Sequence, residues 1–131
     1  ELKIDNRIVW HGWQKHPWEV VRQDIKKVSA LLLTSSFEGF PMTLLESMSW
    51  GIPCISADCV SGPGDIIQPD VNGHLYQPGD IAGFVTLLNK YIAGEIHIEH
   101  EKIPASIDKF YQSKYYDRLH NIIISAISRR K

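Results

Sequence analysis

Several features that would direct this 131-residue sequence toward a particular class of protein are missing. No apolar run approaches the length of a membrane span. The 14 basic and 15 acidic residues give a formal charge of -1, so the total charge carries no sign of nucleic-acid binding. The two cysteines, Cys54 and Cys59, fit neither a disulfide framework nor a zinc pattern. We therefore expect a protein of the reduced cytoplasm that binds no nucleic acid.

The most informative stretch predicts a strand, a loop, a helix and a second strand in that order. An apolar strand over residues 30–33 leads into a Ser- and Gly-containing loop, and Pro41 suits the first helical position because its missing N–H is no loss there. The helix is expected to reach Trp50, Gly51 closes it, and residues 53–56 form the next strand. Such a βαβ unit leaves free helix amides at the carboxyl edge of a parallel sheet, where phosphates bind.

The remaining sequence alternates between strand and helix patterns in the same way. We expect a Rossmann-like parallel α/β sheet with flanking helices, with both faces of its strands covered. A stripe of apolar residues between Tyr115 and Ile127 is expected to be exposed. The other expected elements are a short buried strand over residues 8–10 with Trp10 in the core, a surface helix over 17–28, a strand over 73–76, a helix over 80–91 capped by Asp80, and helices from residue 104 onward.

Two glutamates distinguish the central stretch from a generic phosphate loop. Glu38 lies in the loop before the helix, and Glu46 lies one turn inside it. A carboxylate has only acceptor sites and suits a vicinal diol, because each oxygen can accept one hydroxyl proton. A nucleotide sugar carries a diol on either side of a diphosphate. In this interpretation Glu46 binds the ribose, the amides of Met42 and Thr43 bind the phosphates, and Glu38 binds the transferred sugar.

The context of these glutamates resembles the E-x7-E signature of retaining family 4 glycosyltransferases of the GT-B fold. The segments that carry the likeness are Phe37-Glu38-Gly39-Phe40-Pro41, Leu44-Leu45-Glu46-Ser47-Met48 and Gly51-Ile52-Pro53. The likeness extends from Ile8 to about Tyr91, and residues 72–80 resemble the family's later strand and turn.

This resemblance implies how the chain is divided. Residues 1–104 would form a nucleotide-sugar-binding Rossmann-like half that is incomplete at its N-terminus. Residues 105–131 would be C-terminal helices that pack against the protein's own N-terminal domain, which this sequence does not contain. The family's upstream basic residues for the diphosphate are absent as well. We therefore expect this sequence alone to be inactive and, at best, a weak UDP binder.

The resemblance also implies a reaction. The donor would be UDP-galactose, and the acceptor a glucosyl residue of the lipopolysaccharide core, joined through an α-1,6 linkage with retention and without a metal or other cofactor. The implied donor-binding set is Trp13, Phe40, Met42, Thr43 and Glu46, with Glu38 as the catalytic residue. Trp13 would lie beside the uracil. Pro41 departs from the glycine of many members, so the amides of Phe40 and Met42 must supply the sugar contact.

Other interpretations stay open at this point. The donor could be UDP-glucose or another UDP-sugar, or the protein could be a GT-B epimerase or hydrolase. An interaction domain of receiver type would show the same α/β alternation, whereas an NAD-binding domain would need a Gly-rich fingerprint that is missing. Residues 57–64 form either a structural turn or a ligand contact. The cationic end at 129–131 is a solvated helix end or supports peripheral association with the cytoplasmic face of the inner membrane.

Overall fold

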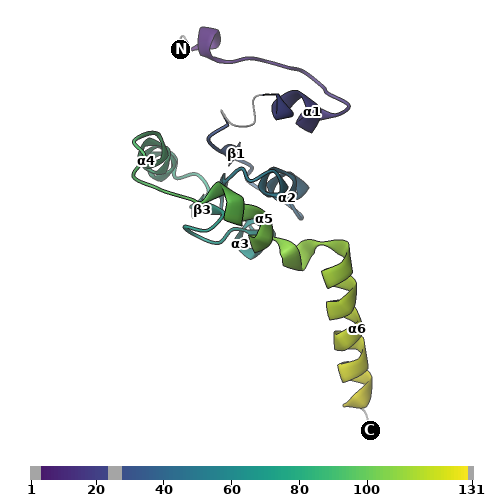
Figure 1. Ribbon diagram of the computed structural model, residues 1–131. Helices are drawn as coiled ribbons and strands as arrows, with labels where there is room; N and C mark the ends of the chain where they lie inside the picture. Colours follow the sequence, from purple (N-terminus) through teal and green to yellow (C-terminus); the bar gives the residue numbers. More distant parts are fainter. Residues whose placement is uncertain (1–3, 24–27, 130–131) are drawn as a thin grey trace.

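The computed structural model describes residues 4–23 and 28–129, which form a three-stranded parallel sheet surrounded by helices (Figure 1). The strands lie in the order β1 (Leu31–Leu33), β2 (Cys54–Ala57) and β3 (Gly73–Tyr76). The helices of the described residues are η1 (Asp5–Arg7), α1 (Pro17–Arg22), α2 (Met42–Ser49), α3 (Pro63–Ile66), α4 (Ile81–Ile92), η3 (His100–Lys102), α5 (Ile103–Ser106), η4 (Asp108–Phe110) and α6 (Gln112–Ser128). The predicted parallel α/β fold class is confirmed.

The hydrophobic core lies where α2 packs against the central strand β2. Leu44 and Met48 of α2 are completely buried, and they pack in one cluster with Cys54 of β2 and Ile103 of α5. The opposite face of β1 is less well covered, since Leu32 is 44% exposed. The prediction that both faces of this strand are covered is therefore wrong. β1 is an edge strand, and its alternating side chains give Leu32 the face opposite to the core.

Close contact between β2 and β3 depends on a glycine. Gly73 pairs with Cys54 in the parallel register, and a Cβ at position 73 would overlap the Cys54 carbonyl oxygen. The thiol of Cys54 is buried at this contact, and burial raises its pKa to about 12. Cys54 is therefore a neutral core residue at physiological pH.

The first part of the chain differs from its prediction. Residues 8–10 form no strand, and Trp10 is 84% exposed instead of lying in the core. A run of three apolar residues gains its stability as a strand from a paired neighbour, and none pairs with it in the described sheet. The predicted helix over residues 17–28 begins correctly at Pro17 but ends at Arg22. Part of its predicted continuation, residues 24–27, lies outside the described residues.

The predicted helix after β3 is confirmed in α4. Its N-cap is Asp80, whose Oδ1 accepts a hydrogen bond from the amide of Gly83 at 2.8 Å. This carboxylate satisfies one of the open amides at the start of α4, so the cap explains why the helix begins where the sequence predicts.

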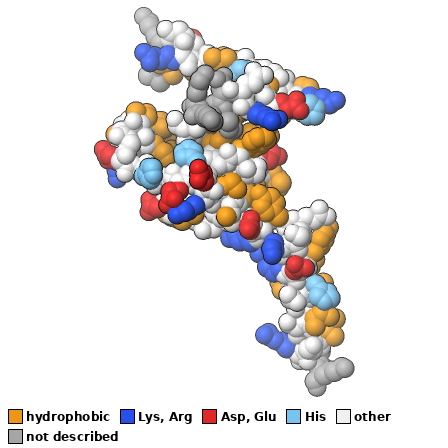
Figure 2. Space-filling view, viewed as in Figure 1, with side chains coloured by type: hydrophobic (Ala, Val, Ile, Leu, Met, Phe, Trp, Pro, Cys, Tyr) orange, Lys and Arg blue, Asp and Glu red, His pale blue; other side chains and the backbone are white. Residues whose placement is uncertain are grey.

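The last helix, α6, projects away from the sheet, and the two ends of the chain lie at opposite ends of the molecule (Figure 1). None of its described residues is buried, which confirms the predicted exposed stripe. Hydrophobic side chains along it lie next to basic ones on the surface (Figure 2). The stripe consists of Tyr115, Leu119, Ile122, Ile123 and Ile127. Across the described residues, no helix combines the length and the apolar character that crossing a membrane requires.

Candidate functional site

The start of α2 offers open backbone donors. Pro41 is the N-cap with a non-helical ψ of 88°, so the helix begins at Met42 and not at the predicted Pro41. Its carbonyl accepts a hydrogen bond from the amide of Leu44 at 3.1 Å. No side chain of the described residues caps this end, which leaves the amides of Met42 and Thr43 available. With the partial positive charge of the helix end, this is a place where an anion can bind.

The loop that carries Glu38 is supported by the loop after β2. The Ser61 hydroxyl donates to the Glu38 carbonyl oxygen at 3.2 Å. Gly62 has a φ of +99°, and a Cβ there would lie 2.5 Å from Cδ of Pro41 and 3.1 Å from the carbonyl oxygen of Gly39. The two loops therefore touch at the carboxyl ends of β1 and β2. Residues 57–64 include a structural turn that holds the chain before α2.

Glu46 is fixed by a residue from a different element. Its Oε2 accepts a hydrogen bond from the indole Nε1–H of Trp18 at 2.8 Å. Trp18 lies in the first turn of α1, 28 positions earlier in the sequence. The bond joins α1 to α2 at the exposed side of the latter helix. An ionised carboxylate with one indole donor keeps most of its acceptor sites for a ligand.

Two hollows flank α2, and Glu46 lines both of them. One, of about 300 Å³, lies between α1, β1 and α2 and also includes Trp18 and Thr43. The other, of about 190 Å³, includes Met42 and the aromatic rings of Phe110 and Tyr111. Each hollow thus contains Glu46 and one of the two residues whose amides are predicted to bind phosphate, Thr43 in the first and Met42 in the second. Glu38 lines neither hollow, and its predicted contact with the transferred sugar stays a prediction.

The two predicted aromatic site residues lie in different surroundings. The ring of Phe40 packs against Phe110 with centroids 5.7 Å apart, so its side chain is engaged with η4 and only its amide is a candidate for ligand binding. Trp13 is 86% exposed. Gln14 closes the turn in which it lies by donating from Nε2 to the His11 carbonyl oxygen at 2.7 Å. The proposed uracil contact of Trp13 stays a prediction.

Sequence reasoning missed two residues of this site, Trp18 and Ser61. The apolar spacing that predicts a surface helix over residues 17–28 gives Trp18 no role beyond that helix. A tryptophan directly after a helix-starting proline is also a hydrogen-bond donor, and buried or half-buried indoles usually find an acceptor. That signal identifies a donor but not Glu46 as its acceptor. Ser61 carries no signal in its own segment, because its acceptor is the carbonyl oxygen of the distant Glu38.

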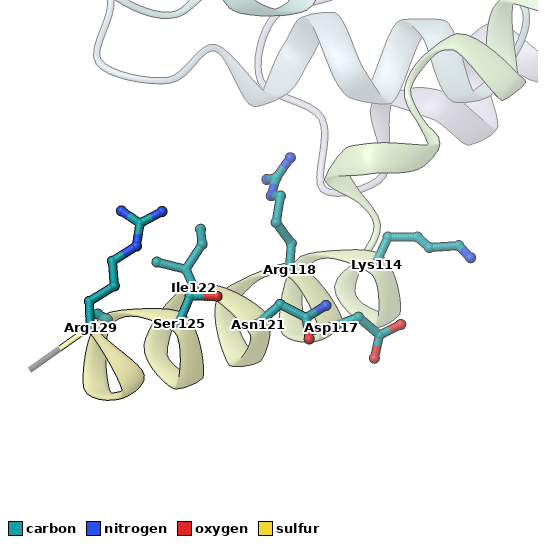
Figure 3. Close-up of a pocket in the computed structure, with 8 residues that line it drawn as sticks. Lys114, Asp117, Arg118, Asn121, Ile122, Ser125 and Arg129 are labelled. Carbon is teal, nitrogen blue, oxygen red and sulfur yellow. The ribbon is translucent and has the colours of Figure 1, made fainter. Parts of the chain in front are cut away.

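A separate hollow of about 650 Å³ lies along α6 and is distinct from this site (Figure 3). Its lining residues belong to α6, among them Lys114 and Arg118, or to its C-cap, Arg129. It is therefore the polar flank of one exposed helix and contains neither of the two glutamates.

The profile of the family described as "Glycosyl transferases group 1" matches residues 1–109. This chain belongs to that family. The match confirms the family that the motif around the two glutamates predicted. It covers the sheet, α2 and the candidate site, and it ends before α6.

Two curated members of the family are similar along almost the entire chain. Lipopolysaccharide 1,6-galactosyltransferase of Escherichia coli strain K12 is 89% identical over 131 residues, which are 100% of this chain and 36% of that protein. The protein of the same description from Salmonella typhimurium strain LT2 is 56% identical over 98% of this chain and 36% of its own length. The chain therefore spans about a third of the length of these relatives.

Solved structures support the fold. A lipopolysaccharide outer core galactosyltransferase, WaaB in its apo form, is 57% identical and superimposes with a TM-score of 0.89 over 94% of this chain and 34% of its own. The structure of TarM is 20% identical, covers 89% of this chain and 24% of its own, and has a TM-score of 0.62, so it supports the fold alone.

Proposed function

We propose that this chain is the donor-binding part of a transferase that moves galactose from UDP-galactose to a glucosyl residue of the lipopolysaccharide core, with retention and in an α-1,6 linkage. The observation that carries this proposal is the 89% identity, over the whole chain, to a lipopolysaccharide 1,6-galactosyltransferase. A protein of the relatives' length that contains this chain is called the intact transferase below. The 131 residues alone are proposed to be inactive.

The chemistry proposed for the site follows from the charges that develop during transfer. The bond between C1 of the sugar and the phosphate breaks, with positive charge growing on the ring and negative charge on the departing diphosphate. The open amides of Met42 and Thr43 stabilise the departing charge. Glu38 binds sugar hydroxyls and favours the cationic ring, while Glu46 binds the ribose hydroxyls of the donor.

No metal has a role in this proposal, because backbone amides bear the departing charge. The intact transferase should therefore keep its full rate in excess EDTA. A rate that falls with EDTA and returns with Mg²⁺ or Mn²⁺ would contradict this part of the proposal.

We also propose that the protein lies in the cytoplasm, at the cytoplasmic face of the inner membrane. The basic residues 129–131 would be attracted to anionic lipid there.

The test of the reaction is a panel of UDP-sugars with a lipopolysaccharide core that ends in the accepting glucose. The intact transferase should consume UDP-galactose and form an α-1,6-linked galactose on the core, identified by linkage analysis. UDP-glucose should react more slowly. Release of free galactose without acceptor, or formation of an epimer, would instead indicate a hydrolase or an epimerase.

The nucleotide-binding role of Glu46 is tested separately by calorimetry with UDP. A hydrogen bond to a charged group contributes about 1.5 to 3 kcal/mol, so Glu46→Ala should weaken UDP binding by about tenfold to a hundredfold. The control is Glu101→Ala, which changes an exposed glutamate of η3. Equal UDP affinity in the unaltered protein and in Glu46→Ala would remove Glu46 from the site.

A further inference from the structure

We infer that Trp18 is a positioning residue for Glu46: its indole holds one oxygen of the carboxylate so that the other oxygen meets the ribose hydroxyls of a nucleotide. This inference rests on the proposed function. It assigns a task to a side chain outside the two-glutamate motif and in a different helix. The observation is the 2.8 Å bond from Trp18 Nε1 to Glu46 Oε2.

The surroundings of the bond favour a lasting contact. Trp18 is half-buried and lines the hollow between α1, β1 and α2, whose other walls include the apolar side chains of Val21, Leu31 and Ile52. These side chains give the hollow beside the indole a largely apolar wall. Glu46 lies at the same hollow but is itself exposed. An indole has two side-chain torsions and a glutamate three, so the indole is the more restricted partner of the bond and determines where the carboxylate lies.

The indole of Trp18 and the carboxylate of Glu46 have different hydrogen-bonding capacities. The indole N–H is only a donor, so it occupies one of about four acceptor positions on the ionised carboxylate. Among the described residues no other group donates to this carboxylate, so Oε1 can accept the two ribose hydroxyls. A free glutamate on a helix surface loses rotamer freedom when it binds a ligand, and immobilising such a side chain changes affinity by about threefold to tenfold. The bond to Trp18 already restricts the Glu46 side chain in the free protein, so less rotamer freedom is lost when the nucleotide binds.

Two other roles for the same bond predict different results. If Trp18 closed the site and had to leave Glu46 before binding, its removal would strengthen nucleotide binding. If Trp18 only supported α1, its removal would weaken the binding of every nucleotide equally. A positioning role predicts a loss that depends on the ribose hydroxyls, since these are the groups that Glu46 is proposed to bind.

The experiment measures the affinity of the intact transferase for UDP and for 2′,3′-dideoxy-UDP by calorimetry. Trp18→Phe keeps the ring and deletes the N–H. Its matched control is Trp50→Phe, which makes the same change at the C-cap of α2, away from the bond to Glu46. We expect Trp18→Phe to bind UDP about threefold to tenfold more weakly and dideoxy-UDP with unchanged affinity. Trp50→Phe should leave both affinities unchanged.

Three results would overturn the inference while leaving the proposed function intact. They are tighter UDP binding by Trp18→Phe, an equal loss for both nucleotides, and no change for either. If UDP fails to bind the unaltered protein, or binds Glu46→Gln with the same affinity, the donor site itself is wrong and the inference falls with it. In the Glu46→Gln background, adding Trp18→Phe should cause a smaller loss than it causes alone.

A second measurement needs no change at Trp18 and covers the case in which Trp18→Phe does not fold. The indole N–H resonances of the four tryptophans are recorded by ¹H–¹⁵N NMR. One of them should lose its protection from hydrogen exchange in Glu46→Ala, which identifies it as Trp18. We expect that resonance to stay protected when UDP is added. Loss of protection on adding UDP would mean that the bond breaks on binding, and would overturn the inference.

Discussion

Helices α2 and α6 both carry an apolar face, yet the structure covers only one of the two. In α2, Leu44 and Met48 are completely buried against β2 and α5, whereas α6 has no buried residue among those described. The difference lies in what each helix meets. α2 is enclosed by the βαβ unit that contains it, and α6 follows η4 away from the sheet (Figure 1). Helical spacing therefore predicts that a face exists, while topology decides whether it is covered.

The largest expected effect comes from making the same substitution in both helices. Leu44→Ala should lower the free energy of unfolding by about 2 to 5 kcal/mol, because it empties a fully buried site. Leu119→Ala removes a side chain that is 38% exposed, so its effect should be within about 0.5 kcal/mol. Urea denaturation of the two variants of this chain measures both values.

Equal effects at these two positions would break the comparison, since they would mean that α6 is covered in solution. Repeating Leu119→Ala in the intact transferase sharpens it. A larger loss there than in the 131-residue chain would support the proposal that this stripe packs against another domain of the same protein.

The next effect concerns two glycines with positive φ, Gly62 in a crowded place and Gly79 in an open one. A Cβ at Gly62 would clash with Pro41 before α2, whereas a Cβ at Gly79 would meet nothing. Alanine at either position is strained, but only Gly62→Ala adds a steric clash, which should make it about 1 to 3 kcal/mol more destabilising than Gly79→Ala. Thermal unfolding of the two variants measures the difference. Similar losses would show that the contact between the loops contributes nothing.

Much of the secondary structure around α2 could be predicted from the sequence alone. The strand before the motif, the helix from Met42, the closing Gly51 and the Asp80 cap are all local signals, and each element lies within one or two residues of its prediction. The position of the uncapped start of α2 between the two glutamates was predictable for the same reason. Two acids and a proline at a helix start are properties of a short segment.

The wrong or missing predictions all concern contacts between residues that are distant in the sequence. Trp10 has the apolar character of a core residue but no neighbouring strand to pack with in the described sheet. Leu32 belongs to an apolar run, yet it lies on the less covered face of an edge strand. The bond from Trp18 to Glu46 joins residues 28 positions apart. Local patterns carry no information about such long-range pairings.

A further expected effect, which is confined to alkaline pH, is a dependence of stability on pH that comes from the buried core. Burial keeps the folded-state pKa of Cys54 at about 12, above its ordinary value of 9.0. Above pH 9 the unfolded chain loses this proton and the folded chain keeps it, so the free energy of unfolding should fall by about 1.4 kcal/mol per pH unit up to about pH 12. Below pH 9 the contribution is constant.

Cys54→Ala isolates this contribution, because it removes the titrating thiol whatever else it does to stability. The difference in unfolding free energy between the unaltered chain and the variant should shrink as the pH rises from 9 to 11. A difference that stays constant over this range would show that the thiol is not buried in solution.

The most direct test is to titrate the intact transferase with UDP while following assigned backbone amides by ¹H–¹⁵N NMR. The start of α4 serves as an internal control, because Asp80 already caps it. If the diphosphate binds at the start of α2, the amides of Met42 and Thr43 should shift and saturate together, while those of Ala82 and Gly83 stay in place. Saturable shifts at α4 with none at Met42 and Thr43 would contradict the account.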